Sequence, residues 1–195
     1  MEASSILQTM LSASSIKGMS KTTGASQEQV AAILSQAMPV LLNGATKQTK
    51  GAAAKGFSQA LADHAQNSTS NIGSFLKNVD LDDGAKIISH LLGSSTDSKT
   101  KSIAKAAGVD VGTTSSVLSA IGPLLMSLLG QSAGGNTSGS ALGSIIGGLA
   151  QNVNVGDLLG GLLGGTSAST SSKSKTKKSS GSKGSIAESI LGMLK

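Results

Sequence analysis

A stretch of 22 residues that recurs 84 positions later constrains this chain more than any other sequence feature. Residues 20–41 align without gaps on residues 104–125, and six of the 22 positions are identical. The identical positions include a glycine and a proline at the same separation, Gly24 and Pro39 in one copy and Gly108 and Pro123 in the other. Glycine and proline make the most specific demands on the backbone, and the chain has only two prolines. The match predicts an internal duplication, with copies at about 15–44 and 99–130.

Each copy has the pattern of a short helix, a glycine turn and a longer helix. In the first copy, Ser26 and Gln29 have the spacing of a capping box, which predicts a helix from about Gln27. Each proline falls deep inside the longer helix, where we expect it either to kink the helix or to end it and begin another. The apolar residues of the first long helix recur at helical spacing, on one face: Val30, Ile33, Leu34, Ala37, Met38, Leu41 and Leu42.

The second long helix is expected to carry a similar apolar face, made by Val117, Leu118, Ile121, Leu125 and Met126. Shorter segments with helical apolar spacing lie near residues 6–11, 57–65, 72–79, 87–92, 158–163 and 186–194. No segment shows a two-residue alternation typical of a strand. The predicted fold class is all-α, a helical bundle built from a duplicated helix–turn–helix unit.

Small residues are unevenly distributed along the chain. Gly, Ser and Pro make up 32% of it, a level at which disorder has to be considered. Residues 166–185 contain nine serines and five lysines, and their one apolar residue is an alanine. Such a segment buries too little surface to offset its chain entropy. We therefore predict a duplicated helical domain at 1–130, a Gly/Leu-rich helical segment at 131–165, a disordered linker at 166–185 and a short amphipathic helix at 186–195.

The positive charge is concentrated in this linker. Residues 1–165 carry ten lysines and nine acidic residues, whereas the linker carries five lysines and no acid. Basic tails bind anionic membranes or nucleic acid through salt-dependent attraction, and a solubilising tether has the same composition. No aromatic residue lies between the lysines to stack on bases, so no specific nucleic-acid readout is expected. The candidate contacts for a weak anionic partner are Lys173, Lys175, Lys177, Lys178 and Lys183.

The composition leaves few groups for catalysis. The chain has no Cys, Trp, Tyr or Arg, which excludes a thiol nucleophile, a cysteine–zinc site and a guanidinium fork for phosphate. No phosphate-binding loop, nucleophile elbow or dinucleotide fingerprint occurs. We expect no catalytic residue, no cofactor and no bound metal, and therefore a protein that is not an enzyme.

Glycines four residues apart are the first candidate site. On a helix this spacing makes a flat groove that another backbone can approach closely. Three interpretations stay open: packing within the fold, self-association or contact with a membrane surface, and a flexible low-complexity segment. The glycines of this possible helix-packing groove are Gly139, Gly143, Gly147, Gly156, Gly160 and Gly164.

The acidic segment 80–84 and the two histidines are weaker candidates. Counted from Asp80, the glycine and glutamate positions of a calcium loop are not matched, so we expect an acidic cap for the helix that carries residues 87–92. Gly93 is placed to end that helix. His64 and His90 have no partners at metal-ligand spacing, and we expect ordinary structural roles for both.

The duplicated pattern resembles a known family. A glycine, a capped helix and a proline near its end, twice, with Ile-Ile-Ser-His-Leu-Leu-Gly at 87–93 between the copies, is similar to the bacterial domain of unknown function 937, to which YidB-like proteins belong. The resemblance covers about residues 5–130, and the Gly/Leu-rich stretch 157–165 is similar to the ends of such proteins. It implies a bacterial helical protein and brings no activity, cofactor or catalytic residue with it.

The sequence therefore favours a non-enzymatic helical protein that acts through self-association or protein–protein interaction. The alternative is binding to an anionic surface, membrane or nucleic acid, through the basic tail. The N-terminus lacks the features of a secretory signal, and no uninterrupted apolar run reaches the length of a membrane span. We expect a cytoplasmic protein without a transmembrane segment.

Overall fold

The computed structural model describes residues 3–134, 136 and 138–151, and all of its regular elements are helices. This confirms the predicted all-α class for the described part of the chain. The chain divides into two units, Met1–Gly165 and Thr166–Lys195, and the description below concerns the first. Its elements are α1 (Ala3–Met10), α2 (Ala13–Thr23), α3 (Gln27–Gln48), α4 (Ala53–Ala65), α5 (Ile72–Lys77), α6 (Leu81–Leu92), the 3₁₀ turn η1 (Gly93–Ser95), α7 (Thr96–Ala107), α8 (Val111–Ala133) and α9 (Gly139–Gln151).

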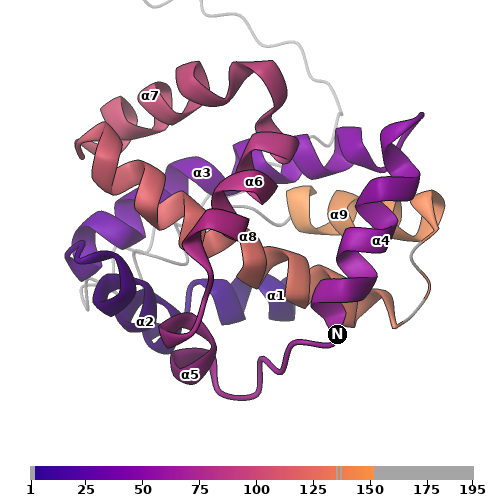
Figure 1. The fold of residues 1–195 in the computed structure, drawn as a ribbon, viewed down its shortest axis with the longest axis horizontal. Coiled ribbons are helices and arrows are strands. Elements are labelled where there is room, and N and C mark those ends of the chain that lie inside the picture. Colours follow the sequence, from indigo (N-terminus) through magenta and orange to yellow (C-terminus); the bar gives the residue numbers. More distant parts are fainter. Residues whose placement is uncertain (1–2, 135, 137, 152–195) are drawn as a thin grey trace, which may run out of the picture. The chain divides into compact units, whose positions relative to one another are not determined.

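Helix α8 is the centre of this unit. It contacts each of the other described α-helices, and Figure 1 shows it passing through the middle of them. The sequence predicted an apolar face, but α8 is buried on every side, including at Ser119, Ala120, Gly122 and Ser127. The five residues of the predicted apolar face are themselves buried as expected, and the burial extends to the other sides because further helices pack there. Helix α3 keeps polar residues on its outer side and buries all seven residues of its predicted apolar stripe.

Both predicted helix–turn–helix units are present as local structure. Gly24 ends α2 with a φ of 75°, and Gly108 ends α7 with a φ of 67°. This left-handed conformation is the one that glycine adopts without strain. After each glycine a side chain caps the long helix: Ser26 forms the predicted capping box with Gln29, and the Asp110 carboxylate accepts the Thr113 N–H at 2.8 Å. The common origin of the two units stays a prediction.

The prolines do not end their helices. Pro39 lies inside α3 and Pro123 inside α8, and both helices continue beyond them, so the second of the two expected alternatives, a new helix after each proline, is wrong. Their surroundings differ: Pro39 is exposed, whereas Pro123 is buried. Proline has no N–H to offer the carbonyl four residues earlier. In α8 that carbonyl belongs to Ser119, and helix α6 lies against it.

Helices α6 and α8 cross with their backbones in close approach. A Cβ atom at Gly84 in α6 would lie 1.8 Å from the Ser119 carbonyl oxygen and 3.1 Å from Pro123 Cδ. A Cβ atom at Gly122 in α8 would lie 3.1 Å from the Gly84 carbonyl oxygen. Real Cβ atoms essentially never approach another atom to within 3.0 Å, and 3.1 Å is tighter than nine in ten real Cβ contacts. The crossing therefore requires glycine at 84, and it brings α6 against the carbonyl that Pro123 leaves without its helical partner.

By length and composition alone, α8 could cross a membrane, and no other helix of the described residues meets that test. However, 72% of its most apolar window is buried inside the fold. A core helix of a soluble protein has the same length and composition. The length and apolar composition of α8 are therefore accounted for by its packing among the neighbouring helices.

One buried polar atom in α8 gives a direct stability prediction. The Ser127 side chain is fully buried, and its hydroxyl has no hydrogen-bond partner among the residues that the structure describes. Replacing it, Ser127→Ala, removes an unsatisfied buried group, so we expect the free energy of unfolding to rise by about 1 kcal/mol in urea denaturation. Thr114→Val is the matched contrast, because the buried Thr114 hydroxyl donates to the Asp110 carbonyl at 2.8 Å. It should lower stability by about 1 kcal/mol; a loss at Ser127 as well would contradict the prediction.

Candidate functional site: a polar basic groove

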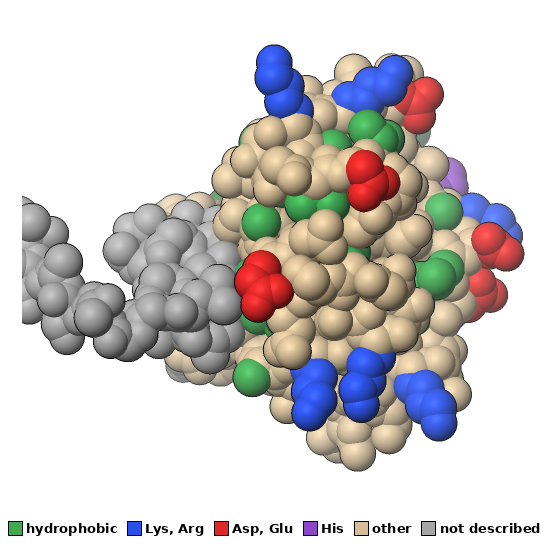
Figure 2. All heavy atoms as spheres, turned by 90° about the vertical axis from the view of Figure 1, so that its left-hand side faces the viewer, with side chains coloured by type: hydrophobic (Ala, Val, Ile, Leu, Met, Phe, Trp, Pro, Cys, Tyr) green, Lys and Arg blue, Asp and Glu red, His purple; other side chains and the backbone are tan. Residues whose placement is uncertain are grey.

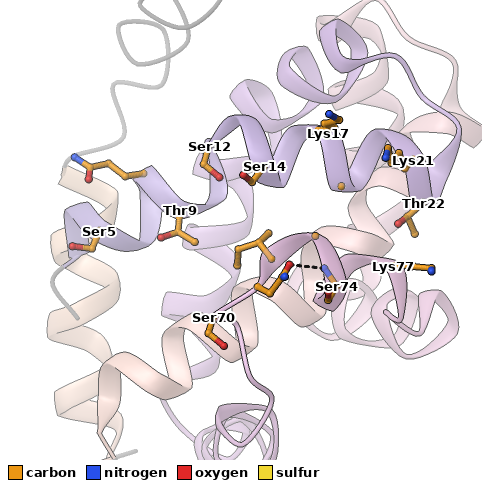
Figure 3. A pocket seen from close by; sticks show the side chains of 15 residues that line it. Ser5, Thr9, Ser12, Ser14, Lys17, Lys21, Thr22, Ser70, Ser74 and Lys77 are labelled. Atoms are coloured by element: carbon orange, nitrogen blue, oxygen red, sulfur yellow. Dashed lines mark hydrogen bonds between the residues drawn. The ribbon is translucent and has the colours of Figure 1, made fainter.

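A long polar groove lies between the α1–α2 pair and the segment of residues 70–77. It has a volume of about 1250 Å³. Of its 15 lining residues, all except Gly18, Ile72 and Gly73 carry a hydroxyl, amide or ammonium group, and none is acidic. Figure 3 shows Ser5, Thr9, Ser12 and Ser14 along α1 and α2, with Ser70 and Ser74 on the facing wall.

The α1–α2 wall is shaped by serine and threonine bonds to the backbone. Between the two helices, Ser12 caps α2 by accepting the Ser15 N–H at 3.2 Å. The buried Ser15 hydroxyl donates to the Thr9 carbonyl at the end of α1. Ser, Thr, Asn and Asp favour such local bonds over the helix interior. The chain therefore breaks here into two helices and keeps exposed polar groups on the groove side of both.

The floor of the groove is the contact between α2 and α5. Gly18 lets the helices approach closely, since a Cβ atom there would lie 2.7 Å from Leu76 Cδ1. Thr22 then ties the helices together, its hydroxyl donating to the Leu76 carbonyl at 2.8 Å. Leu76 itself is fully buried. On the other side, Asn71 caps α5 by accepting the Ser74 N–H at 3.0 Å, a bond that Figure 3 marks.

Three lysines give the groove its charge. Lys17 and Lys21 are four residues apart and so lie on one face of α2, and Lys77 ends α5 on the facing wall. All three are exposed, and within the described residues no carboxylate lies within 4.0 Å of their ammonium groups. Figure 2 shows lysine side chains gathered along the lower edge of this face, where Figure 1 places α2 and α5, with acidic side chains higher up. As far as the described residues go, the groove is thus a positive, hydrogen-bonding surface without a neutralising carboxylate.

The predicted glycine stripe is only partly described, and its members have different surroundings. A Cβ atom at Gly139 would lie 2.5 Å from the Thr49 carbonyl oxygen, so this glycine packs against the end of α3. A Cβ atom at Gly143 would come no closer than 3.9 Å to Thr49 Oγ1, and one at Gly147 would meet nothing within 4 Å. For Gly139 the structure favours packing within the fold. The remaining members, Gly156, Gly160 and Gly164, lie outside the described residues.

The basic linker lies wholly outside the described residues. The structure therefore says nothing of its five candidate contacts, Lys173, Lys175, Lys177, Lys178 and Lys183. Their role as anion contacts stays a prediction from composition.

The acidic segment caps α6 as its sequence predicted, and the two histidines lie at different places in the fold. Asp80 caps α6 by accepting the N–H groups of Asp82 and Asp83 at 2.9 and 3.1 Å, and Gly93 caps its end; both caps were predicted. His64 Nε2 lies 3.6 Å from an Asp83 carboxylate oxygen. His90 is exposed, and its carbonyl accepts a hydrogen bond from Gln48. Within the described ranges, no three metal-ligating side chains come together.

Sequence reasoning missed the three groove lysines. The spacing of Lys17 and Lys21 was a usable signal for a basic helix face, although a solvated face has the same pattern. Lys77 is 56 residues further along the chain than Lys21, and only the packing of α5 on α2 brings it to the same groove.

The comparisons with known proteins agree with the resemblance seen in the sequence. A search of the curated proteins and a search of the solved structures gave no significant match. A family model matches residues 5–132, which include every residue lining the groove and end within α8. That model describes a bacterial protein of unknown function (DUF937) and covers well over half of the chain. The chain therefore belongs to the DUF937 family of bacterial proteins of unknown function.

Proposed function

We propose that this protein is a non-enzymatic binding protein that holds an anionic partner in the groove between α1, α2 and α5. The observation that carries the proposal is the convergence of Lys17, Lys21 and Lys77 on a polar groove that has no acidic residue in its described lining. A concave surface lined by one sign of charge raises the local concentration of oppositely charged partners. The hydroxyl and amide groups add neutral hydrogen-bonding positions between the charges.

The test compares three variants of the full chain. The groove variant is K17A/K21A/K77A, and the matched control K86A/K101A/K105A removes the same charge from three exposed lysines outside the groove. Exposed ion pairs contribute about 0.2–1 kcal/mol each, so the groove variant should bind a heparin fragment about tenfold more weakly in calorimetry. The control should lose clearly less than that. Equal losses in the two variants would show general charge attraction and contradict the proposal.

The third variant addresses the alternative site in the tail. It replaces the linker lysines 173, 175, 177, 178 and 183 by serine and leaves the groove intact. Under the proposal, this linker variant still binds the heparin fragment through the groove. Adding the K17A/K21A/K77A changes to it should therefore weaken the affinity further. If the linker changes alone abolish binding, the partner is held by the tail, as the alternative prediction from composition has it.

Self-association is a second proposal, supported by one observation. Among the described residues, nothing lies within 4 Å of where a Cβ atom at Gly147 in α9 would be, so the described part of the stripe has room there for a neighbouring backbone. Light scattering on the full chain over a wide concentration range tests this separately. A mass that rises with concentration supports it, and a monomer throughout contradicts it.

A further inference from the structure

The groove has features that distinguish between classes of anionic partner. Nucleic acid, an anionic lipid surface and an acidic protein segment all carry negative charge, but they need different companions for the lysines. The companion groups in this groove are serine, threonine, asparagine and glutamine side chains. Given the proposed function, these companion groups determine which class of anionic partner fits the groove.

A nucleic acid would find little to hold its bases. Single-stranded binding sites stack bases on aromatic side chains or on arginine, and none of the lining residues is aromatic or arginine. The whole chain has only two Phe and no Arg. Three lysines alone would give salt-dependent phosphate contact without base contact, and the many hydroxyl and amide groups would go unused.

A lipid surface fits no better. Membrane-surface binding combines basic residues with apolar side chains that enter the acyl boundary. Within the described part of the chain, the exposed large hydrophobic residue is Val111, which starts α8 and does not line the groove. The lysines also line a hollow, whereas a membrane presents a broad surface to its ligands.

An extended acidic peptide matches both the charged and the neutral polar groups of the groove. Its carboxylates suit the compact ammonium groups of Lys17, Lys21 and Lys77. Its backbone N–H and C=O groups need hydrogen-bond partners between the charges, and the exposed Gln8, Ser14 and Asn71 side chains supply donors and acceptors there. We infer that the groove binds an extended acidic segment of a partner protein.

The experiment uses the full chain and three probes in parallel. These are a labelled short peptide of alternating glutamate and glycine, an oligothymidylate, and vesicles of phosphatidylcholine with phosphatidylglycerol. We expect the peptide to bind and to shift the amide NMR signals of α2 and α5. The groove variant K17A/K21A/K77A should weaken peptide binding about tenfold, while K86A/K101A/K105A should weaken it much less.

The outcomes separate this inference from the proposed function. If the oligonucleotide or the vesicles bind in a groove-dependent way and the peptide does not, the partner class is wrong and the binding function stands. If no probe shifts the α2 and α5 signals, both are wrong. If the peptide binds equally well to the groove variant, its site lies elsewhere and the inference is overturned.

Discussion

The Gly84→Ala variant is expected to lose about 3 kcal/mol or more of its free energy of unfolding. Its new methyl group would lie 1.8 Å from the Ser119 carbonyl oxygen, a backbone atom that cannot rotate away. Overpacking a core costs about 1–3 kcal/mol and occasionally more, and here relief requires α6 to move off α8, the central helix. Urea denaturation followed by circular dichroism measures the change, and large destabilisation should also give partial loss of soluble protein.

The matched control is Gly56→Ala. Gly56 also lies inside a helix, α4, but it is exposed and a Cβ atom there would meet nothing within 4 Å. Alanine is favoured over glycine within a helix by about 0.5–1 kcal/mol, so this variant should be more stable than the original protein. The two substitutions are chemically identical. Opposite effects on the free energy of unfolding would therefore show that the loss at Gly84 comes from the close approach of α6 and α8. Stabilisation by both would show that α6 and α8 do not touch at Gly84.

A second large effect is expected for Leu118→Ala. Leu118 is 1% exposed and lies on α8 among the other helices of the core. Removing a buried leucine side chain costs about 2–5 kcal/mol, because apolar contact is lost and a cavity remains. Since all the described α-helices contact α8, we expect one cooperative transition shifted to lower urea, with the slope unchanged.

Val111→Ala on the same helix is the control for Leu118. Val111 is 44% exposed, so its truncation removes little buried surface and should change stability by at most about 0.5 kcal/mol. A small effect at Leu118 would mean that α8 is not the centre of the core. A second, separate unfolding transition would mean that the helices around α8 do not unfold as one unit.

The local structure of this protein follows closely from its sequence. The capping box at Ser26, the cap at Asp80 and the glycine stop at Gly93 are all found where their sequence patterns predict them. Each depends on contacts within four residues of chain, and those are visible in the order of residues alone. The apolar stripe of α3 is equally local, because helical spacing puts its residues on one face.

The central position of α8 did not follow from its pattern. The spacing of its apolar residues predicted one apolar face. Ser119, Gly122 and Ser127 lie on the other sides of the helix, and they are buried as well. Small residues have no strong preference for the surface, so burial at these positions depends on which helices pack there. The spacing of residues along the sequence does not predict that α6 packs against α8 at Gly84.

The candidate site shows the same division between local and tertiary information. The sequence shows that α2 has exposed polar residues, but a basic helix face occurs on many solvated helices and does not by itself indicate a binding site. Lys17, Lys21 and Lys77 line one groove because α5 packs against α2, at a contact made by Gly18 and Thr22. That contact joins residues more than 50 positions apart, a distance over which no sequence period operates.

The helices, their caps and the turns at Gly24 and Gly108 follow from the order of residues alone, because each of these depends on neighbours along the chain. The sequence also placed the chain in its family through a pattern of such local signals. Which glycines lie at helix contacts, which glycines are exposed and which lysines share a groove depend on the packing of distant segments. Close approach and convergence of charge each need two surfaces, and those surfaces come from residues far apart in the chain.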